Sequence, residues 1–528
     1  MSTVDEEIVE ERDGNKDQKK KKGKENLKQR AYLNSLTSII DFAGKQITGF
    51  IVSPIIVSGL GGNFYGIWQM LMQMTGFADM ADTRATQVLK WTIANRRDVA
   101  SAQELQREAT TALVVTGFIL PVVLIVGAII SWYAPHITKV DEQYYTMIRL
   151  TTSMMIFSMV IYKIFDLYEC ILRGMNLGYK RMGVRAAIIV LAGILKVAVI
   201  YMGYGIVGLA AVQVVIALVT GITFYIIVKK AVWWYGFART NWPKIKSYGK
   251  LSGWFMALNG AGMIMNASDK ILLGYLAGPL LVSNYTLTIF AAAAVESAVG
   301  SVINGIIPGI GGLYGKQEYE KVMKARRLIF SLIWLLIVSL GSAVLVLNQS
   351  FLALWTGEEF YAGDISNLLI VLIGVQGMFF ETDGSIINVT LKLQQKVYFT
   401  LASSLVTLGI ALLLIPPYGV AGLCMSILLG RMILSIGYPI ILRRNMKDTS
   451  PFFQSRLFQQ MIGAALLFGA AIYFNDYISA GNWFTLFLYG GIVTLVAGAV
   501  YWVVGLQSAE RKEIMDLFLK IKFFKKDD

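Results

Sequence analysis

The chain has 528 residues, of which 55% are hydrophobic and only 16% are charged. Soluble proteins carry about 25% charged residues, so this composition excludes an ordinary soluble protein and favours one that crosses a membrane many times. The net charge of +14 does not indicate nucleic-acid binding, because the basic residues lie in tails and loops, where membrane topology places them.

The chain begins with a polar segment and continues with repeated apolar segments. Residues 1–30 hold 9 Lys and Arg and no apolar core, so they are not a cleavable signal peptide. We interpret them as a disordered basic tail on the cytoplasmic side. Fourteen apolar segments of membrane-spanning length follow. Their approximate limits are 31–57, 64–83, 110–134, 146–170, 183–203, 206–228, 249–276, 282–308, 328–348, 364–388, 396–416, 419–442, 456–475 and 483–506.

The charges of the connecting loops predict the topology. Every second loop is basic, and together these loops hold 26 Lys and Arg, whereas the remaining loops hold only Lys139 and, at a span edge, Arg149. Cytoplasmic loops carry the excess of Lys and Arg. We therefore expect both termini in the cytoplasm. The 26 residues lie in 83–109, 171–185, 229–250, 310–327, 389–396 and 443–456.

An internal echo predicts two halves. The first two spans meet at the Gly-rich turn Ser58–Asn63, and residues 271–287 repeat the order of apolar span, Gly-containing turn and Tyr. Paired halves with a substrate site between them are typical of secondary transporters. We expect an all-α polytopic membrane protein with 14 transmembrane helices, and its parts are as follows. They are a six-helix bundle over 31–228, a cytoplasmic linker over 229–248, a second six-helix bundle over 249–442, two further transmembrane helices over 443–506, and a cytoplasmic amphipathic tail over 507–528.

The sequence contains no recognisable enzyme site. The longest outer loop, about residues 348–364, is too short for a catalytic domain of ordinary size. Gly315-Lys316 lacks the rest of a P-loop, because Gln317 follows it. Two cysteines and a single histidine do not make a metal site. We expect no enzyme activity, no cofactor, no metal and no nucleic-acid partner.

Five short motifs, taken in order over roughly residues 33–440, carry a resemblance to a known family. The chain resembles the polysaccharide transporters of the multidrug/oligosaccharidyl-lipid/polysaccharide (MOP) exporter superfamily, the Wzx-type flippases of lipid-linked oligosaccharides. The motifs are Pro54–Trp68 followed by Asp79 or Asp82, Asp269–Tyr285, Pro308–Tyr319, Trp355–Phe360 and Pro417–Gly422.

The resemblance implies a MATE-like fold and a function. It implies a flippase in the cytoplasmic membrane that moves a polyprenyl-diphosphate-linked oligosaccharide to the outer leaflet by alternating access. Its expected partners are that substrate, membrane lipids and polysaccharide assembly proteins. A proton- or sodium-coupled multidrug exporter of the same superfamily is the alternative, with Asp41 as its ion site.

Charged residues within the spans are the candidate site, because a charge at that depth is costly unless it has a partner or a purpose. Cations that line a sealed cavity suit a diphosphate, whose oxygens need charge-assisted donors. The candidate substrate-binding residues are Lys45, Lys196, Lys270 and Arg431, and the candidate ion-coupling residues are Asp41, Asp269 and Glu296.

Four of these assignments have a structural alternative. Asp41 and Lys45 are four residues apart on one helix face, where they can neutralise each other. Lys196 and Arg431 can likewise serve internal packing alone, although Arg431 has no acid within its own span.

Overall fold

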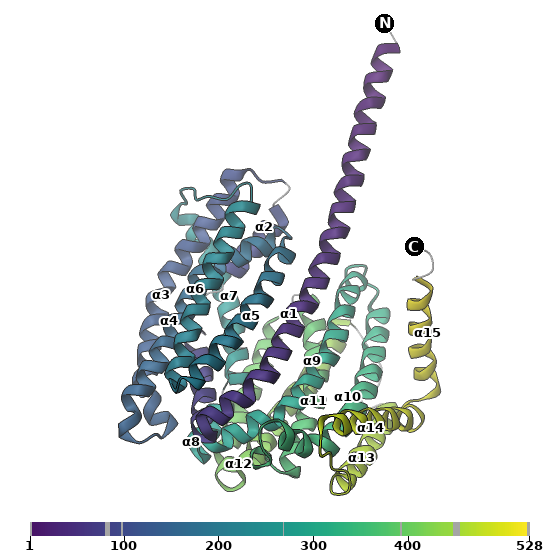
Figure 1. Cartoon of the computed structure of the whole chain (residues 1–528). Coiled ribbons are helices and arrows are strands. Elements are labelled where there is room, and N and C mark those ends of the chain that lie inside the picture. The colour runs from purple at the N-terminus through teal and green to yellow at the C-terminus, as the bar shows by residue number, and fades with distance from the viewer. Residues whose placement is uncertain are drawn as a thin grey trace. The chain divides into compact units, whose positions relative to one another are not determined.

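The fold is entirely helical in the part of the chain that the structure, a computed structural model, describes (Figure 1). That part comprises residues 3–79, 85–96, 99–267, 269–390, 393–446 and 455–524. The predicted motif residue Asp82 lies outside it. The chain forms two compact units. Unit 1 comprises residues 1–60, 75–135 and 140–259, and unit 2 comprises residues 61–74, 136–139 and 260–528.

The helices follow one another with short connections. The first seven are α1 (Thr3–Asp79), α2 (Ala85–Arg96), α3 (Ala102–Thr138), α4 (Tyr145–Gly174), α5 (Gly178–Tyr201), α6 (Gly205–Ala231) and α7 (Trp242–Ala267). They are followed by α8 (Asp269–Ala277), α9 (Pro279–Gly315), α10 (Tyr319–Trp355), α11 (Asp364–Thr390), α12 (Leu393–Met446), α13 (Ser455–Asn475), α14 (Trp483–Val504) and α15 (Ser508–Phe524). Single 3-10 turns precede α4 (Glu142–Tyr144) and α11 (Glu358–Phe360).

Two long helices are each interrupted at one glycine. In α1 the backbone of Gly61 has φ 73° and ψ 160°, and in α12 that of Gly419 has φ 53° and ψ −123°. Only glycine adopts such angles without a steric cost. Both positions fall within predicted turns, Ser58–Asn63 and Pro417–Gly422. The break in each helix is confined to the glycine, so each long helix consists of two arms.

Ten helices among the described residues are long and apolar enough to cross a membrane. The two interrupted helices count once each within the ten, and neither α4 nor α7 is among them. Helix α4 is rich in charge, because it carries Lys163, Asp166, Glu169 and Arg173 among its apolar residues. The predicted number of 14 transmembrane helices therefore exceeds the number that length and hydropathy identify.

Unit 1 packs its α4 helix closely against α6. Gly221 of α6 lies against the ring of Phe165, and a side chain there would collide with that ring. At one end of the unit, Leu89, Leu105 and Trp234 belong to a buried apolar cluster. These contacts fix α4, whose polar face lines the cavity described below.

Unit 2 includes the second arm of α1. Gly66 of this arm lies against the backbone carbonyl of Pro279, and Met70 lies against Gly274, so glycines permit the close approach of α1 to α8 and α9. A buried ion pair joins α10 to α11, where Nε and Nη2 of Arg326 donate to the two carboxylate oxygens of Asp383 over 2.6 and 2.7 Å.

The two ends of the chain are helical where they are described. Helix α1 begins at Thr3 and so includes residues for which a disordered tail is predicted. This stretch is rich in Glu and Lys, which are good helix formers. In the C-terminal helix α15, the buried carboxylate of Glu510 accepts hydrogen bonds from Ser331 and Gln460 over 2.6 and 2.9 Å. Near its start, the predicted amphipathic tail is therefore attached to α10 and α13 through Glu510.

Candidate functional site

A polar cavity of about 190 Å³ lies within unit 1 between α1, α2, α4 and α6. Its wall is mainly one face of α4. The lining residues of this helix are spaced three or four apart, which places their side chains on the same side of the helix. Three acids and one lysine line it, together with Phe165 and Phe224. The polar residues of the lining are Asp79, Gln87, Tyr162, Lys163, Asp166, Glu169 and Thr220.

The lysine of the cavity is paired. Lys163, buried in α4, forms an ion pair with Asp79 at the end of α1. Asp166, one turn further along α4, accepts a hydrogen bond from the hydroxyl of Thr86 in α2. Buried charges require such partners, because an unpaired charge in a low-dielectric interior is costly. The cavity therefore combines fixed, paired charges with an excess of acid over base.

Glu169 lies where the cavity meets a cluster of arginines. Its carboxylate forms an ion pair with Arg181 of α5, and Arg173 and Arg185 lie 3.8 and 3.7 Å from the same oxygen. Nearby in α2, burial and the positive charge of Arg173 lower the pKa of Lys90. Three guanidinium groups around one carboxylate leave this edge of the cavity positively charged.

The predicted pair Asp41 and Lys45 belongs to this cluster. Lys45 Nζ lies 3.0 Å from Asp41, and Arg185 Nε lies 3.7 Å from the other carboxylate oxygen. Asp41 is buried, whereas the side chain of Lys45 is 48% exposed. The mutual neutralisation that the four-residue spacing allows is therefore present, and Asp41 has a second cation beside it.

Lys196 has a different environment. It is half-buried in α5 of unit 1. In the described part of the chain, Lys196 forms no ion pair with an acid. Residues 170–268 contain no Asp or Glu at all, so no acid of its own or the neighbouring helix α6 is available to it.

Asp269 and Lys270 lie together in unit 2 at the start of α8. Lys270 Nζ donates to Gln69 Oε1 over 3.1 Å, and its backbone N–H donates to Asp269 Oδ1 over 2.8 Å. Asp269 Oδ2 accepts from the buried hydroxyl of Tyr285 over 3.2 Å. Gln73 also accepts from the Lys270 N–H, over 3.3 Å. These two charges are thus held by uncharged hydrogen-bonding partners from α1 and α9.

Glu296 and Arg431 form a second charged group in unit 2. Glu296 of α9 lies at a small cavity of about 10 Å³ that is otherwise lined by apolar side chains and glycines. Its carboxylate is against Gly374, where a methyl group would displace it. Electrostatic interactions link Glu296 and Glu381 to Arg431, whose guanidinium lies 5.5 Å from the ring centre of Phe380.

The seven predicted residues therefore fall into three local groups and one isolated lysine. Asp41 and Lys45 are together, Asp269 and Lys270 are together, and Glu296 interacts with Arg431. A joint role in substrate binding or ion coupling stays a prediction. Arg181 and Arg185 were not among the predicted site residues. Their four-residue spacing places them on one face of α5, and their ion pairs with Glu169 show that this face meets α4.

No group of three or more His, Cys, Asp or Glu within the described residues has a geometry that suits a metal ion. The two cysteines are both buried. The site residues that the structure does bring together are suited to ion pairing and hydrogen bonding with a polar ligand.

Comparison with known proteins identifies the fold. No protein-family profile matches the chain, and no curated protein matches it at a significant level. Among solved structures, the lipid II flippase MurJ in an inward closed conformation matches with a TM-score of 0.68 at 11% identity, over 88% of this chain and 98% of the MurJ chain.

Two multidrug transporters are also similar. An inward-facing MATE family transporter of the MOP superfamily matches with a TM-score of 0.57 at 15% identity, over 79% of this chain and 96% of its own. A MATE transporter from Vibrio cholerae matches with a TM-score of 0.55 at 16% identity, over 80% and 98%. These structural neighbours are transporters. At such low identity they show the fold alone, and the predicted all-α, MATE-like fold is confirmed.

Proposed function

We propose that the chain is a flippase that carries a polyprenyl-diphosphate-linked oligosaccharide across the cytoplasmic membrane by alternating access. The observation that supports this proposal most is the match to a lipid II flippase, which has a higher TM-score and covers more of this chain than the matches to multidrug transporters (0.68 over 88% against 0.57 over 79%). The motifs that resemble the Wzx-type flippases point to the same class of cargo.

The charges within the membrane-spanning helices agree with an anionic cargo. Lys196 lies in an acid-free stretch of the sequence. The ammonium group of Lys270 donates to the amide oxygen of Gln69 rather than to a carboxylate. Such cations retain the capacity to bind diphosphate oxygens, which prefer charged donors. We propose Lys196, Lys270 and Arg431 as diphosphate-binding residues, with Lys45 assigned instead to the pair with Asp41.

We also propose fourteen transmembrane helices with both termini in the cytoplasm. The ten candidate helices become twelve when the interrupted helices α1 and α12 are counted as two arms each, and α4 and the α7–α8 segment bring the number to fourteen. The 26 basic residues of alternate loops support this orientation.

Cysteine labelling tests the topology. A membrane-impermeant maleimide is expected to label Ser58→Cys and Glu359→Cys in intact cells, and to label Lys246→Cys and Lys316→Cys only after the membrane is opened. All four residues are exposed, and both native cysteines are buried and serve as an unreactive background. Labelling of Lys246→Cys in intact cells would overturn the count of spans before it.

One observation favours the alternative of a cation-coupled multidrug exporter. The cavity of unit 1 is lined by Asp79, Asp166 and Glu169 against a single lysine, and by the rings of Phe165 and Phe224. Carboxylates together with aromatic faces suit an organic cation. The positive cluster around Glu169 opposes this function, because it surrounds one of the three acids with arginines.

Transport assays with purified full-length protein in liposomes separate the two functions. We expect a fluorescent polyprenyl-diphosphate oligosaccharide in the inner leaflet to become accessible to an external quencher, and we expect no gradient-driven accumulation of an organic cation. The reverse result, accumulation of the cation without flipping, would contradict the proposed function and support the exporter.

The same assay tests ion coupling. We propose Glu296 as the coupling acid, because Asp41 already has two cationic partners whereas Glu296 faces an apolar cavity. Glu296→Gln is expected to flip at the same rate with and without an imposed proton or sodium gradient, while Asp41→Asn keeps the wild-type dependence. Full gradient dependence in Glu296→Gln would place coupling elsewhere.

A further inference from the structure

The segment that leads from α6 into α7, residues 229–250, has an unusual composition. It contains six Lys and Arg, six aromatic residues and no Asp or Glu. Five of the six cations are exposed, and in the described part of the chain these five form no ion pair. The five are Lys229, Lys230, Arg239, Lys246 and Lys250.

The backbone of this segment is firmly attached to α3. Gln106 Nε2 donates to the carbonyl of Trp234 over 2.9 Å, and the hydroxyl of Thr110 accepts from the N–H of Ala238 over 3.1 Å. The hydroxyls of Thr111 and Thr240 are 2.7 Å apart. The segment is therefore held in one conformation on the end of unit 1, which distinguishes it from a solvated loop.

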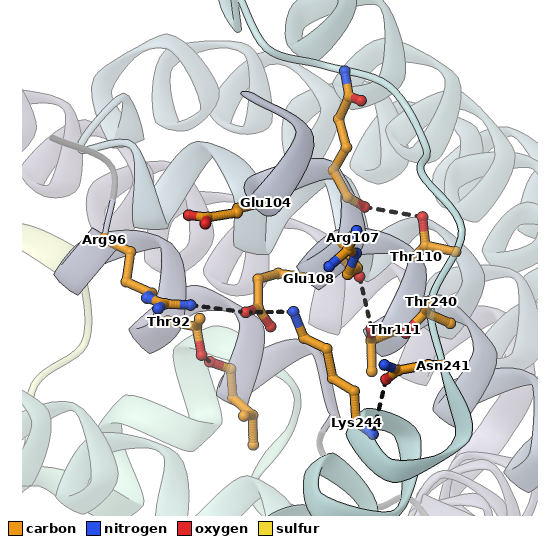
Figure 2. A network of polar contacts seen from close by, with 12 residues as sticks. Thr92, Arg96, Glu104, Arg107, Glu108, Thr110, Thr111, Thr240, Asn241 and Lys244 are labelled. Atoms are coloured by element: carbon orange, nitrogen blue, oxygen red, sulfur yellow. Dashed lines mark hydrogen bonds and ion pairs between the residues drawn. The ribbon is translucent and has the colours of Figure 1, made fainter. Parts of the chain in front are cut away.

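The sixth cation serves this attachment. Figure 2 shows Glu108 between Arg96 and Lys244, which lie 3.3 and 2.9 Å from its carboxylate. Glu108 is buried. Lys244 and Arg96 carry two positive charges beside the single negative charge of Glu108. This acid therefore does not cancel the positive potential of the five exposed cations.

The aromatic residues of the segment divide into buried and exposed members. Trp234 is buried, and its indole N–H donates to the sulfur of Met175 over 3.2 Å. Trp233, Phe237 and Trp242 are 70%, 50% and 65% exposed. Exposed aromatic side chains beside basic ones are typical of the boundary between lipid headgroups and acyl chains.

One aromatic contact joins this segment to the apolar surface of α3. The ring of Trp242 meets that of Phe118 edge to face, with 6.3 Å between ring centres. Phe118 is an exposed residue of the strongly apolar helix α3. It lies eight residues beyond Thr110, and at 1.5 Å per residue this is about 12 Å along the helix. Trp242 therefore contacts a strongly apolar helix about two turns beyond the level at which Thr110 and Thr111 hold the segment.

We propose that residues 229–250 form a binding surface for anionic phospholipids, with the five exposed cations on the headgroup phosphates and the three exposed aromatic side chains at the acyl boundary. Basic segments beside membrane-spanning helices are attracted to anionic lipid surfaces. The positive charge of the segment complements the phosphate headgroups, and the segment contains no acid. Together with the contact of Trp242 with Phe118, this favours a lipid rather than a protein as the occupant. The proposal does not depend on the cargo or on the direction of transport.

Titration of detergent-solubilised full-length protein with phosphatidylglycerol and, separately, phosphatidylcholine tests this proposal, with bound lipid counted by native mass spectrometry. The wild-type protein is expected to prefer phosphatidylglycerol. The triple variant Arg239→Gln, Lys246→Gln, Lys250→Gln should bind phosphatidylglycerol about 100-fold more weakly, from about a fivefold factor for each cation. Its affinity for phosphatidylcholine should not change, and its circular dichroism melt should match the wild type.

A matched control removes the same charge from another basic loop. The variant Lys316→Gln, Lys321→Gln, Lys324→Gln changes three exposed cations, two of which have acidic partners at 3.0 and 3.3 Å. It is expected to keep the wild-type affinity for phosphatidylglycerol within about twofold, because two of its three cations already have acidic partners. Equal losses in the two triple variants, or an undiminished affinity in the first, would overturn the proposal.

Discussion

Arg326→Ala is expected to lower the free energy of unfolding by about 3–5 kcal/mol, because it leaves a buried carboxylate without its charge partner. The side chain of Asp383 is only 2% exposed, and that of Arg326 is 14% exposed. Two parallel hydrogen bonds of 2.6 and 2.7 Å join them across α10 and α11, and the guanidinium lies 4.2 Å from the ring centre of Phe330. The change in the detergent-solubilised protein is measured by thermal and chemical unfolding.

Two further variants isolate the charge from the packing. Arg326→Met combined with Asp383→Leu removes both charges and is expected to recover most of the loss, as replacement of buried ion pairs by apolar residues often does. Lys321→Ala breaks an exposed pair with Glu318 and is expected to cost less than about 1 kcal/mol. If Arg326→Ala is no worse than Lys321→Ala, the pair between α10 and α11 does not stabilise unit 2.

Lys196→Gln is expected to slow the flipping of a diphosphate-linked cargo by about 10- to 150-fold, the factor that corresponds to one charge-assisted contact of about 1.5–3 kcal/mol. This lysine is half-buried in α5 and lies in a stretch of 99 residues, 170–268, that contains no acid. Its charge is therefore available to a ligand. Flipping is measured in liposomes at equal protein abundance.

Lys45→Gln is the matched control for this experiment. Lys45 belongs to the same unit and carries the same charge, but it is 48% exposed and lies 3.0 Å from Asp41. Arg185 remains beside Asp41 in this variant, so the flipping rate is expected to change by less than about threefold, as for a partly exposed pair. An unchanged rate in Lys196→Gln would contradict its assignment to the cargo, and increased efflux of organic cations would favour the exporter.

Local sequence patterns predicted the features that depend on neighbouring residues. The glycine-containing turns identified the interruptions at Gly61 and Gly419, since their particular combinations of φ and ψ have no steric cost only for glycine. The four-residue spacing of Asp41 and Lys45 allowed an ion pair within one helix turn as an alternative to their candidate roles, and the structure contains this pair. Apolar segments of membrane-spanning length predicted the all-α architecture, and the motifs that resemble the Wzx-type flippases predicted its MATE-like fold.

The partners of charges on different helices were not predictable in this way. Arg185 reaches Asp41 from α5, and Arg326 reaches Asp383 from α10. Helical periodicity shows which face of a helix a residue occupies, but it does not show which other helix packs against that face. The placement of residues 61–74 in unit 2 was hidden for the same reason, because their contacts with α8 and α9 are not visible in the sequence around them.

The placement of residues 61–74 in unit 2 has a consequence for the synthesis of the protein. Gln69 accepts a hydrogen bond from Lys270, a residue 201 positions later in the chain. At a translation rate of about 5–20 residues per second, this partner emerges about 10–40 s after Gln69 itself. During that interval the second arm of α1 has neither α8 nor α9 to pack against. The surface at Gly66, which later contacts Pro279, then faces lipid or the insertion machinery. Substitutions in this arm therefore act on the nascent chain before unit 2 has assembled.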